Sequence, residues 1–485
     1  MDKPGVKARK VAVDVLTRVD KTKAFSNLAL DSALTKAKLE LRDSAFVTAL
    51  VQGVLRHKIN IDRQIEALSS QPLAKIKAPV LNVLRISIFQ LEQMPDLPAS
   101  AVVDTACDIA RAVGHPGIVK FVNGLLRNYL RSMPPAKAER QVQDIETLTG
   151  EPEAVREKLD ELAASYSMPT WLVERWLKNF GEEETLALLK ACQKPPKLTL
   201  RVNNMAIETP ALQTILANSG ITTTRSKLVP TCLIVEQQNE RKKLEEWPGF
   251  TEGLFTVQDE SAAFVSQVVA PKAGEQIIDL CAAPGGKSIN LAELMDGKGK
   301  VVAVDKHESR LKLLKETRLR LALRNIETKC ADGRVFKYPG GADRVLVDAP
   351  CSGTGVISKR SDLRQNRKEE DLAKLIKLQG GLLKNAATLV RPGGVLVYST
   401  CSIEREEGPE VIEAFLEANS DFKLESFTDA FSRECLDEMD LRAEAKAGSV
   451  MFLPSKHKVA GFYIAKLRRD MSEDIQPPLE HAQEL

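Results

Sequence analysis

The second half of the chain alternates short apolar runs with helical stretches, and this alternation restricts the fold more than any other feature. Strand candidates from residue 255 onward are Ile277 to Cys281, Val301 to Val304, Arg344 to Val347, Val395 to Tyr398 and Gly461 to Leu467. Helical segments separate most of them. Such an order predicts an α/β domain with a parallel, doubly wound sheet.

The first 135 residues carry a helical pattern instead. Phe46, Leu50 and Val54 recur at a spacing of four behind Ser44, a candidate helix cap, and the run from Val80 to Leu91 repeats that spacing. Several short helices with apolar stripes predict an all-α bundle.

Between these regions, residues 155–250 mix helical stretches (171–179 and 182–191) with strand-like pieces, which predicts a small α+β unit. The expected division is a bundle over 1–135, a polar connector over 133–153, the α+β unit over 155–250, the α/β domain over 255–467 and a frayed tail over 468–485.

Charge and targeting signals narrow the class of protein. Residues 1–140 hold 22 Lys and Arg against 13 Asp and Glu, whereas the whole chain has a net charge of only +3. This excess fits a polyanionic partner, but it also fits an ordinary solvated helical surface. The N-terminus lacks a signal-peptide pattern, and Arg85 interrupts the most apolar helical stretch, so we expect a cytoplasmic protein with no membrane partner.

The eight cysteines include no Cys-x-x-Cys pair, and no histidine pair has ligand spacing. A structural zinc site and a disulfide framework are therefore not expected.

A glycine-rich turn, DLCAAPGGKS (279–288), closes the first strand candidate and opens a helix. Gly285 and Gly286 permit close backbone approach, and ligands of open α/β sheets bind at the carboxyl ends of strands. Asp305 ends the next strand, where a carboxylate can accept both hydroxyl hydrogens of a ribose, and Asp332 is placed to reach an adenine amine.

The sequence of this turn matches neither of two common phosphate-binding motifs. It lacks the GxGxxG of dinucleotide sites, which disfavours a nicotinamide oxidoreductase. Gly286-Lys287-Ser288 resembles the end of a P-loop, but Cys281 stands where its first glycine belongs. An adenosine-bearing cofactor without phosphates fits better, and S-adenosylmethionine is the commonest of these. A plain turn with incidental glycines stays an alternative.

Two cysteines, Cys351 in VDAPCSGTG and Cys401 in VYSTCS, follow strand candidates closely. Both should lie at the same sheet edge as the glycine-rich turn. A thiolate that adds to C6 of cytosine makes C5 nucleophilic toward a sulfonium methyl, which is covalent catalysis. Asp348 can hold the N3/N4 edge of the base. The residues alone do not decide which cysteine attacks.

In combination, FTVQDESA (255–262), DLCAAPGGKS, VVAVD, ADGR, LVDAPCSGTGV and VYSTCS resemble the Sun/Nop family of RNA 5-methylcytosine methyltransferases. The resemblance spans about 155–467 and implies a Rossmann-like methyltransferase domain. It implies that Cys401 is the nucleophile and that Cys351 assists product release. The implied cofactor contacts are Cys281, Ala282, Ala283, Pro284, Gly285, Gly286, Lys287, Asp305, Asp332 and Asp348.

The segments VQGVLRHK (51–58) and KFVNGLLR (120–127) make the bundle similar to the NusB-like RNA-binding domain. The combination implies a cytosine in small-subunit ribosomal RNA as substrate. Cytosine methylation of tRNA or of another rRNA site, and a non-catalytic RNA-binding assembly factor, stay as alternatives. The loop KRSDLRQNR after Cys351 departs from the family pattern. Residues 419–460 are long and acidic, and we expect a surface insertion there.

Overall fold

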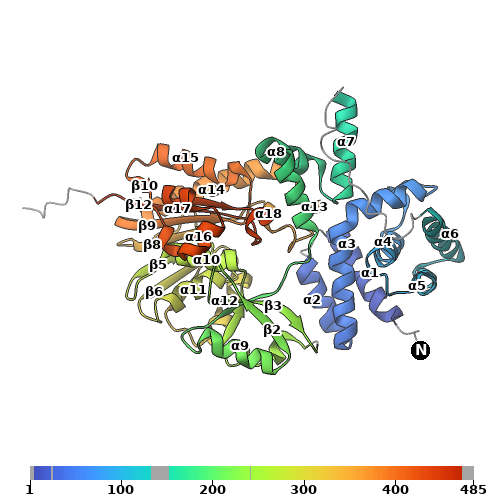
Figure 1. The fold of residues 1–485 in the computed structure, drawn as a ribbon, viewed down its shortest axis with the longest axis horizontal. Helices are drawn as coiled ribbons and strands as arrows, with labels where there is room; N and C mark the ends of the chain where they lie inside the picture. Colours follow the sequence, from blue (N-terminus) through green and yellow to red (C-terminus); the bar gives the residue numbers. More distant parts are fainter. Residues whose placement is uncertain (1–4, 23–25, 133–151, 241, 472–485) are drawn as a thin grey trace, which may run out of the picture. The chain divides into compact units, whose positions relative to one another are not determined.

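The computed structural model describes residues 5–22, 26–132, 152–240 and 242–471 (Figure 1). By its internal contacts the chain divides into two compact units. We call Met1–Pro196 with Ile357–Glu369 the helical unit, and Lys197–Val356 with Glu370–Leu485 the sheet unit. The predicted connector lies outside the described residues except at 152 and 153, and so does the predicted tail beyond residue 471.

The helical unit contains helices from both of its chain segments. They are α1 (Val6–Thr22), α2 (Ser26–Ala37), α3 (Leu41–Leu68), η1 (Leu73–Lys75), α4 (Ala78–Gln93), α5 (Ala99–Val113), α6 (Pro116–Ser132), α7 (Pro152–Ser165), α8 (Thr170–Gln193) and α13 (Leu363–Asn366).

The predicted apolar repeats form the core of this bundle. Leu50, Val54 and Leu84 are fully buried, as the helical spacing requires. The predicted cap at Ser44 is wrong. Helix α3 already begins at Leu41, and the Ser44 amide donates to the carbonyl of Glu40 at 2.9 Å, so Ser44 lies within the first turn.

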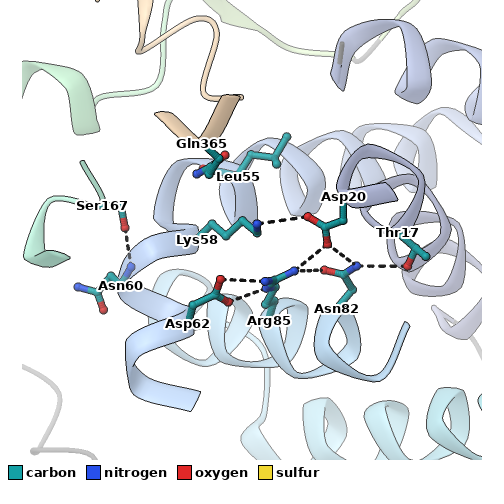
Figure 2. A network of polar contacts seen from close by, with 10 residues as sticks. All are labelled: Thr17, Asp20, Leu55, Lys58, Asn60, Asp62, Asn82, Arg85, Ser167 and Gln365. Carbon is teal, nitrogen blue, oxygen red and sulfur yellow. Dashed lines mark hydrogen bonds and ion pairs between the residues drawn. The ribbon is translucent and has the colours of Figure 1, made fainter. Parts of the chain in front are cut away.

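A buried ion network joins α1, α3 and α4 (Figure 2). Arg85, the residue that interrupts the apolar stretch of α4, is 5% exposed. Its Nε and Nη2 donate to the two carboxylate oxygens of Asp62 at 2.6 and 2.8 Å, and its Nη1 donates to Asp20 at 2.8 Å. Lys58 lies 3.2 Å from the other oxygen of Asp20. A buried guanidinium is tolerated here because carboxylates surround it.

Helix α8 is two helices joined at a kink, which agrees with the two helical stretches predicted there. Gly181 has φ 78° and ψ 178° inside α8. Glycine takes this backbone conformation without steric cost, so the chain bends at this residue.

The sheet unit begins with a small antiparallel sheet in the order β2-β3-β1-β4. Its elements are β1 (Thr199–Val202), α9 (Thr209–Asn218), β2 (Ile221–Arg225), β3 (Cys232–Gln238), η3 (Leu244–Glu246) and β4 (Phe255–Val257). Leu200, Leu212 and Leu233 are fully buried between α9 and this sheet.

The main sheet has the order β10-β12-β9-β8-β5-β6-β7, with β11 paired to β12. Its strands are β5 (Gln276–Asp279), β6 (Lys300–Asp305), β7 (Ile326–Cys330), β8 (Ala342–Asp348), β9 (Val390–Thr400), β10 (Phe422–Leu424), β11 (Ser449–Phe452) and β12 (Phe462–Arg469). Strands β5 to β9 are parallel, which confirms the predicted doubly wound core. Strands β10, β11 and β12 pair antiparallel and make the whole sheet mixed.

Helices cover both faces of this sheet (Figure 1). Helices α10 (Glu260–Val269), α11 (Gly286–Leu294) and α12 (Glu308–Arg320) pack on one face, and α14 (Glu370–Leu389) and α15 (Pro409–Ala418) pack on the other. Alternate residues of each strand enter opposite cores, as the two-residue period of a strand requires. Ile277 and Ile278 illustrate this alternation.

Residues 419–460 contribute to the core, so the expected surface insertion is wrong. The segment contains η6 (Thr428–Ala430), α16 (Arg433–Glu438), α17 (Arg442–Ala447) and α18 (Pro454–His457). The rings of Phe431 and Phe452 have their centroids 4.4 and 5.7 Å from that of Phe264 on α10. These apolar residues lie among the acidic ones and complete one face of the main sheet.

No helix in the described ranges is both long and apolar enough to cross a membrane.

Candidate functional site

The glycine-rich turn between β5 and α11 is shaped by one residue that cannot carry a side chain. Gly285 has φ +114°, and a Cβ there would lie 2.6 Å from Cγ of Leu314 on α12. Both the backbone conformation and the space therefore require glycine. The turn follows Asp279, so it lies at the carboxyl edge of the parallel strands, where the sequence predicted a cofactor pocket.

Asp305 ends β6 and is held against this turn. One of its carboxylate oxygens accepts from the Ala283 amide at 3.2 Å, and the other accepts from the His307 amide at 2.9 Å. Arg310 donates to the Ala283 carbonyl at 2.5 Å and lies 3.7 Å from Asp305. Each carboxylate oxygen retains a second lone pair, so hydroxyl groups can still donate to Asp305.

Asp332 follows β7 and is paired with a neighbour in the chain. Arg334 donates to both of its carboxylate oxygens, with the shortest contact at 2.5 Å. Hydrogen bonds from the Arg334 side chain and amide lower the pKa of Asp332 to about 2. Asp332 is therefore ionised and can accept from an amine.

Lys287 and Asp348, both predicted site residues, form an ion pair. Lys287 is the second residue of α11, and its Nζ donates to one oxygen of Asp348 at 2.7 Å. Ser399 on β9 donates to the other oxygen at 2.8 Å. Asp348 is thus fixed at the end of β8 by contacts from two other elements.

Carboxylates surround Cys281. Burial raises the pKa of the Cys281 thiol well above its ordinary value, and the negative charges of Asp279, Asp348 and Asp305 raise it further. Desolvation also raises the pKa of Asp279 to about 7, although Ser288 donates to that carboxylate. At neutral pH Asp279 is therefore only about half ionised, and the charges of Asp348 and Asp305 face the cations Lys287 and Arg310.

The side chains of the two candidate cysteines are in contact. The sulfur atoms of Cys351 and Cys401 lie 3.4 Å apart, within hydrogen-bond range. The hydrogen bond from Cys351 lowers the pKa of Cys401, and the positive charge of Lys287 acts in the same direction. The same hydrogen bond, together with burial, raises the pKa of Cys351 well above its ordinary value. Cys401 is therefore the better thiolate and Cys351 the better proton donor.

A buried carboxylate that the sequence analysis missed holds the Cys351 loop. Glu407, in η5 (Arg405–Glu407), is fully buried and accepts from the Ser352 amide at 2.9 Å. It also accepts from the Ser352 hydroxyl and, at 3.0 Å, from the Gln379 side chain on α14. Glu407 is the last of three glutamates after Cys401, and no local pattern separates it from the others.

Backbone and hydroxyl contacts join the loops that carry the two cysteines. The Ser402 hydroxyl lies 3.1 Å from those of Ser352 and Thr354. The Gly355 amide donates to the Cys401 carbonyl at 3.1 Å. Neither loop can shift without breaking contacts to the other, so the distance between the two sulfurs is well defined.

Of the predicted residues, the structure brings together Cys351 with Cys401, Lys287 with Asp348, and the turn with Asp305. Asp332 pairs with Arg334 instead. Among the described residues, no group of His, Cys, Asp and Glu side chains is arranged to hold a metal ion. The arrangement brings two thiols, the Lys287–Asp348 ion pair and the glycine-rich turn to one edge of the sheet.

Family models match all three predicted regions. Residues 266–468 match "16S rRNA methyltransferase RsmB/F", residues 6–131 match "NusB family", and residues 168–240 match the "Methyltr_RsmF/B-like, ferredoxin-like domain". These matches confirm the expected fold class, which combines an all-helical NusB-like bundle, a small α+β unit and a methyltransferase domain.

Curated relatives match along nearly the whole chain. A protein of Bacillus subtilis named "Probable ribosomal RNA small subunit methyltransferase B" is 34% identical over 95% of this chain and 98% of its own length. "Ribosomal RNA small subunit methyltransferase B" of Vibrio cholerae is 31% identical over 91% of this chain and 93% of its own. The crystal structure of PH0851 covers 97% of this chain and 100% of its own, with a TM-score of 0.78 and 28% identity.

Proposed function

Because this chain belongs to the family of bacterial ribosomal RNA small subunit methyltransferase B, we propose that it methylates C5 of a cytosine in small-subunit rRNA through a covalent bond between Cys401 and C6. The observation that carries this proposal is the 3.4 Å contact between Cys351 and Cys401. The pKa of Cys401 is lowered and that of Cys351 is raised, which suits one thiol to attack C6 and the other to donate a proton during elimination. Methylation of an oxygen or an amine needs no thiolate.

S-adenosylmethionine is the cofactor of this methyltransferase, and it supplies an electrophilic methyl group on a sulfonium. The turn from Cys281 through Ala282, Ala283, Pro284, Gly285 and Gly286 to Lys287 would hold it together with Asp305, Asp332 and Asp348. The structure favours this fit because Gly285 keeps the backbone free of a side chain and carboxylates surround the turn. Asp305 would accept from the ribose hydroxyls, and Asp332 from the adenine amine.

In the proposed reaction, the Cys401 thiolate attacks C6 of the cytosine: a sulfur–carbon bond forms, the C5–C6 double bond breaks, and an enamine forms across C4 and C5. C5 would then accept the methyl group, and the electrons of the broken methyl–sulfur bond would stay with the donor's sulfur. After methylation, a base removes the proton from C5, the C5–C6 double bond re-forms, and Cys401 leaves as a thiolate. Cys351 lies against the leaving sulfur and can donate its proton to it, which makes elimination easier.

Asp348 would hold the base in register with Cys401. Its carboxylate lies at the end of β8, two residues before Pro350-Cys351, and can accept from the exocyclic N4 amine. The ion pair with Lys287 and the hydrogen bond from Ser399 hold the carboxylate in a fixed orientation.

The NusB-like region would supply RNA affinity through its excess of Lys and Arg over Asp and Glu. Its substrate would be small-subunit rRNA, which implies a cytoplasmic location in a bacterial cell.

The test is bisulfite sequencing of small-subunit rRNA from cells with and without the gene, followed by restoration of the mark with purified protein, S-adenosylmethionine and unmodified rRNA. One cytosine of small-subunit rRNA should lose its protection from bisulfite in cells without the gene and regain it after treatment with the purified protein. If a tRNA or another rRNA lost protection instead, that RNA would be the substrate. An unchanged pattern in every RNA would favour a non-catalytic assembly factor.

A further inference from the structure

The loop that carries Cys351 continues directly into a segment that belongs to the other unit. The sheet unit ends at Val356, residues Ile357–Glu369 group with the helical unit, and the sheet unit resumes at Glu370. We call Ile357–Glu369 the docked segment. It includes the loop in which the sequence departs from the family pattern, and nothing in the proposed chemistry uses it.

Arg364 anchors the docked segment by its guanidinium. The side chain is 2% exposed, and it donates to four backbone carbonyls. These are Arg56 on α3 at 2.8 Å, Tyr166 and Ser167 between α7 and α8 at 3.1 and 3.4 Å, and Cys192 on α8 at 2.6 Å. One side chain therefore ties three parts of the helical unit to the segment.

Neighbouring contacts make the attachment extensive. Gln365 donates to the carbonyl of Leu55 at 3.0 Å, and Arg56 donates to the carbonyl of Ser358 at 3.2 Å. Ser26 on α2 donates to Asp362, a carboxylate that is 2% exposed, at 3.3 Å.

The stretch of α3 that receives these contacts is itself fixed. Figure 2 shows Leu55 with Gln365, and on the same helix Lys58 and Asp62 with the ion network around Arg85. The docked segment is therefore attached to a part of α3 that further contacts hold in place, and its position follows that of the bundle.

The other end of the connection is fixed in the catalytic site. The Gly355 amide donates to the Cys401 carbonyl at 3.1 Å, and its carbonyl accepts from Gly461 at 2.9 Å. Only Val356 stands between Gly355 and the docked segment, and two residues span about 7 Å at most. The docked segment therefore cannot move far from Gly355 without pulling on the Cys351 loop.

We propose that Arg364 is a positioning residue for methyl transfer: it fastens the docked segment to the helical unit, and the segment in turn sets the position of the Cys351 loop. The inference rests on the proposed role of Cys351. It assigns the helical unit a part in the chemical step, in addition to the RNA binding proposed for its NusB-like region.

The first test compares full-length Arg364→Met and Arg364→Lys with Arg156→Met, a change of an exposed arginine on α7 that lies outside the NusB-like region. We expect Arg364→Met to speed hydrogen exchange in 349–369 and to slow single-turnover methylation at saturating rRNA by about tenfold or more. The half-saturating rRNA concentration and calorimetric S-adenosylmethionine binding should stay within about twofold. We expect Arg364→Lys to keep part of the methylation rate that Arg364→Met loses.

The second test keeps Arg364 and breaks the connection. Two glycines inserted between Val356 and Ile357 should slow single turnover as Arg364→Met does, and the combination should add little. The same insertion between Gly340 and Gly341, where a Cβ would meet nothing at Gly340, is the control.

An insertion that leaves the rate unchanged would overturn the proposal even if Arg364→Met fails to fold. So would a normal rate in Arg364→Met, or a loss explained wholly by weaker cofactor binding. If the unaltered protein methylates no RNA, the proposed function fails and this proposal with it. Hydrogen exchange then still reports whether Arg364 holds the segment.

Discussion

The sulfur atoms of Cys351 and Cys401 lie 3.4 Å apart although 50 residues separate them in the chain. Strands β8 and β9 are parallel neighbours, with Asp348 opposite Ser399, and each cysteine follows the end of its strand closely. The pairing is therefore a product of sheet register, and it holds the two thiols within hydrogen-bond range of each other.

This contact predicts that substitution of Cys401 and substitution of Cys351 affect the reaction differently. Cys401→Ser should abolish turnover and covalent RNA adducts, because a hydroxyl is far less ionised than a thiol at neutral pH. Cys351→Ala should lower turnover and let the adduct accumulate, because the leaving thiolate loses its proton donor. Denaturing gel electrophoresis with labelled rRNA measures the covalent adduct in both variants. Adducts in Cys401→Ser that are absent from Cys351→Ala would reverse the roles.

The rate of adduct formation should depend on pH through Cys401. The rate rises as pH rises through the pKa of Cys401, since the thiolate is the nucleophile, and the hydrogen bond from Cys351 holds this pKa below its ordinary value. Removal of the donor in Cys351→Ala raises that pKa, so the rising limb moves to higher pH. Single-turnover adduct yields across a pH series test this. A limb that moves to lower pH would contradict it.

Glu407 should matter although it lies outside the reacting atoms. Glu407→Gln removes the charge that accepts from Ser352 and Gln379, and a buried hydrogen bond to a charged group contributes about 1.5–3 kcal/mol. We expect a stability loss of this size and a lower rate of adduct formation. Glu410→Gln, at a half-exposed position, is the control. Equal melting temperatures and rates for the two variants would exclude the role.

The sequence predicted the parts of the site that depend on strand ends. Cys351, Cys401, Asp305 and Asp348 each stand close behind an apolar run, so their shared edge follows from the doubly wound pattern. The ion pair between Lys287 and Asp348 was not foreseen, because it depends on the rotation of α11.

Glu407 and Arg364 could not be predicted for a related reason. Both are buried charged residues whose partners come from distant segments, and their sequence neighbourhoods look like solvated turns. The role of residues 419–460 was hidden similarly, because acidic residues separate Phe431 and Phe452.

Gly285 should be essential for cofactor binding. Gly285→Ala places a Cβ 2.6 Å from Leu314 at φ +114°, so the turn must shift. Gly274→Ala is the matched control, because Gly274 has φ +89° but open space, and it should cost only about 1–2 kcal/mol of backbone strain. Calorimetry should show S-adenosylmethionine affinity lost in the first variant and kept in the second. Unchanged affinity in Gly285→Ala would show that the turn does not contact the cofactor.

The ion network of Figure 2 predicts a stability effect within the helical unit. Arg85→Met leaves Asp62 without the guanidinium that binds both its oxygens. Loss of one partner of a fully buried pair costs about 3 kcal/mol or more, and because Asp62 is 21% exposed we expect a loss of about 1–3 kcal/mol here. Arg111→Met, which removes an exposed pair with Asp108, should cost under about 1 kcal/mol. Hydrogen exchange of α3 and α4 amides measures both.

The effect of Arg85→Met should also depend on pH. Desolvation raises the pKa of Asp20, but the charges of Arg85 and Lys58, with hydrogen bonds, outweigh it and lower this pKa in the folded chain. The carboxylate therefore adds stability above its unfolded pKa of about 3.9 and loses it as pH falls through the folded value. Without Arg85 the pKa of Asp20 is less depressed, and less stability is available to lose. The unaltered protein should therefore lose protection of α3 more steeply below about pH 4, and the gap between the two proteins should narrow there. A gap that widens on acidification would show that Asp20 does not draw its stability from Arg85.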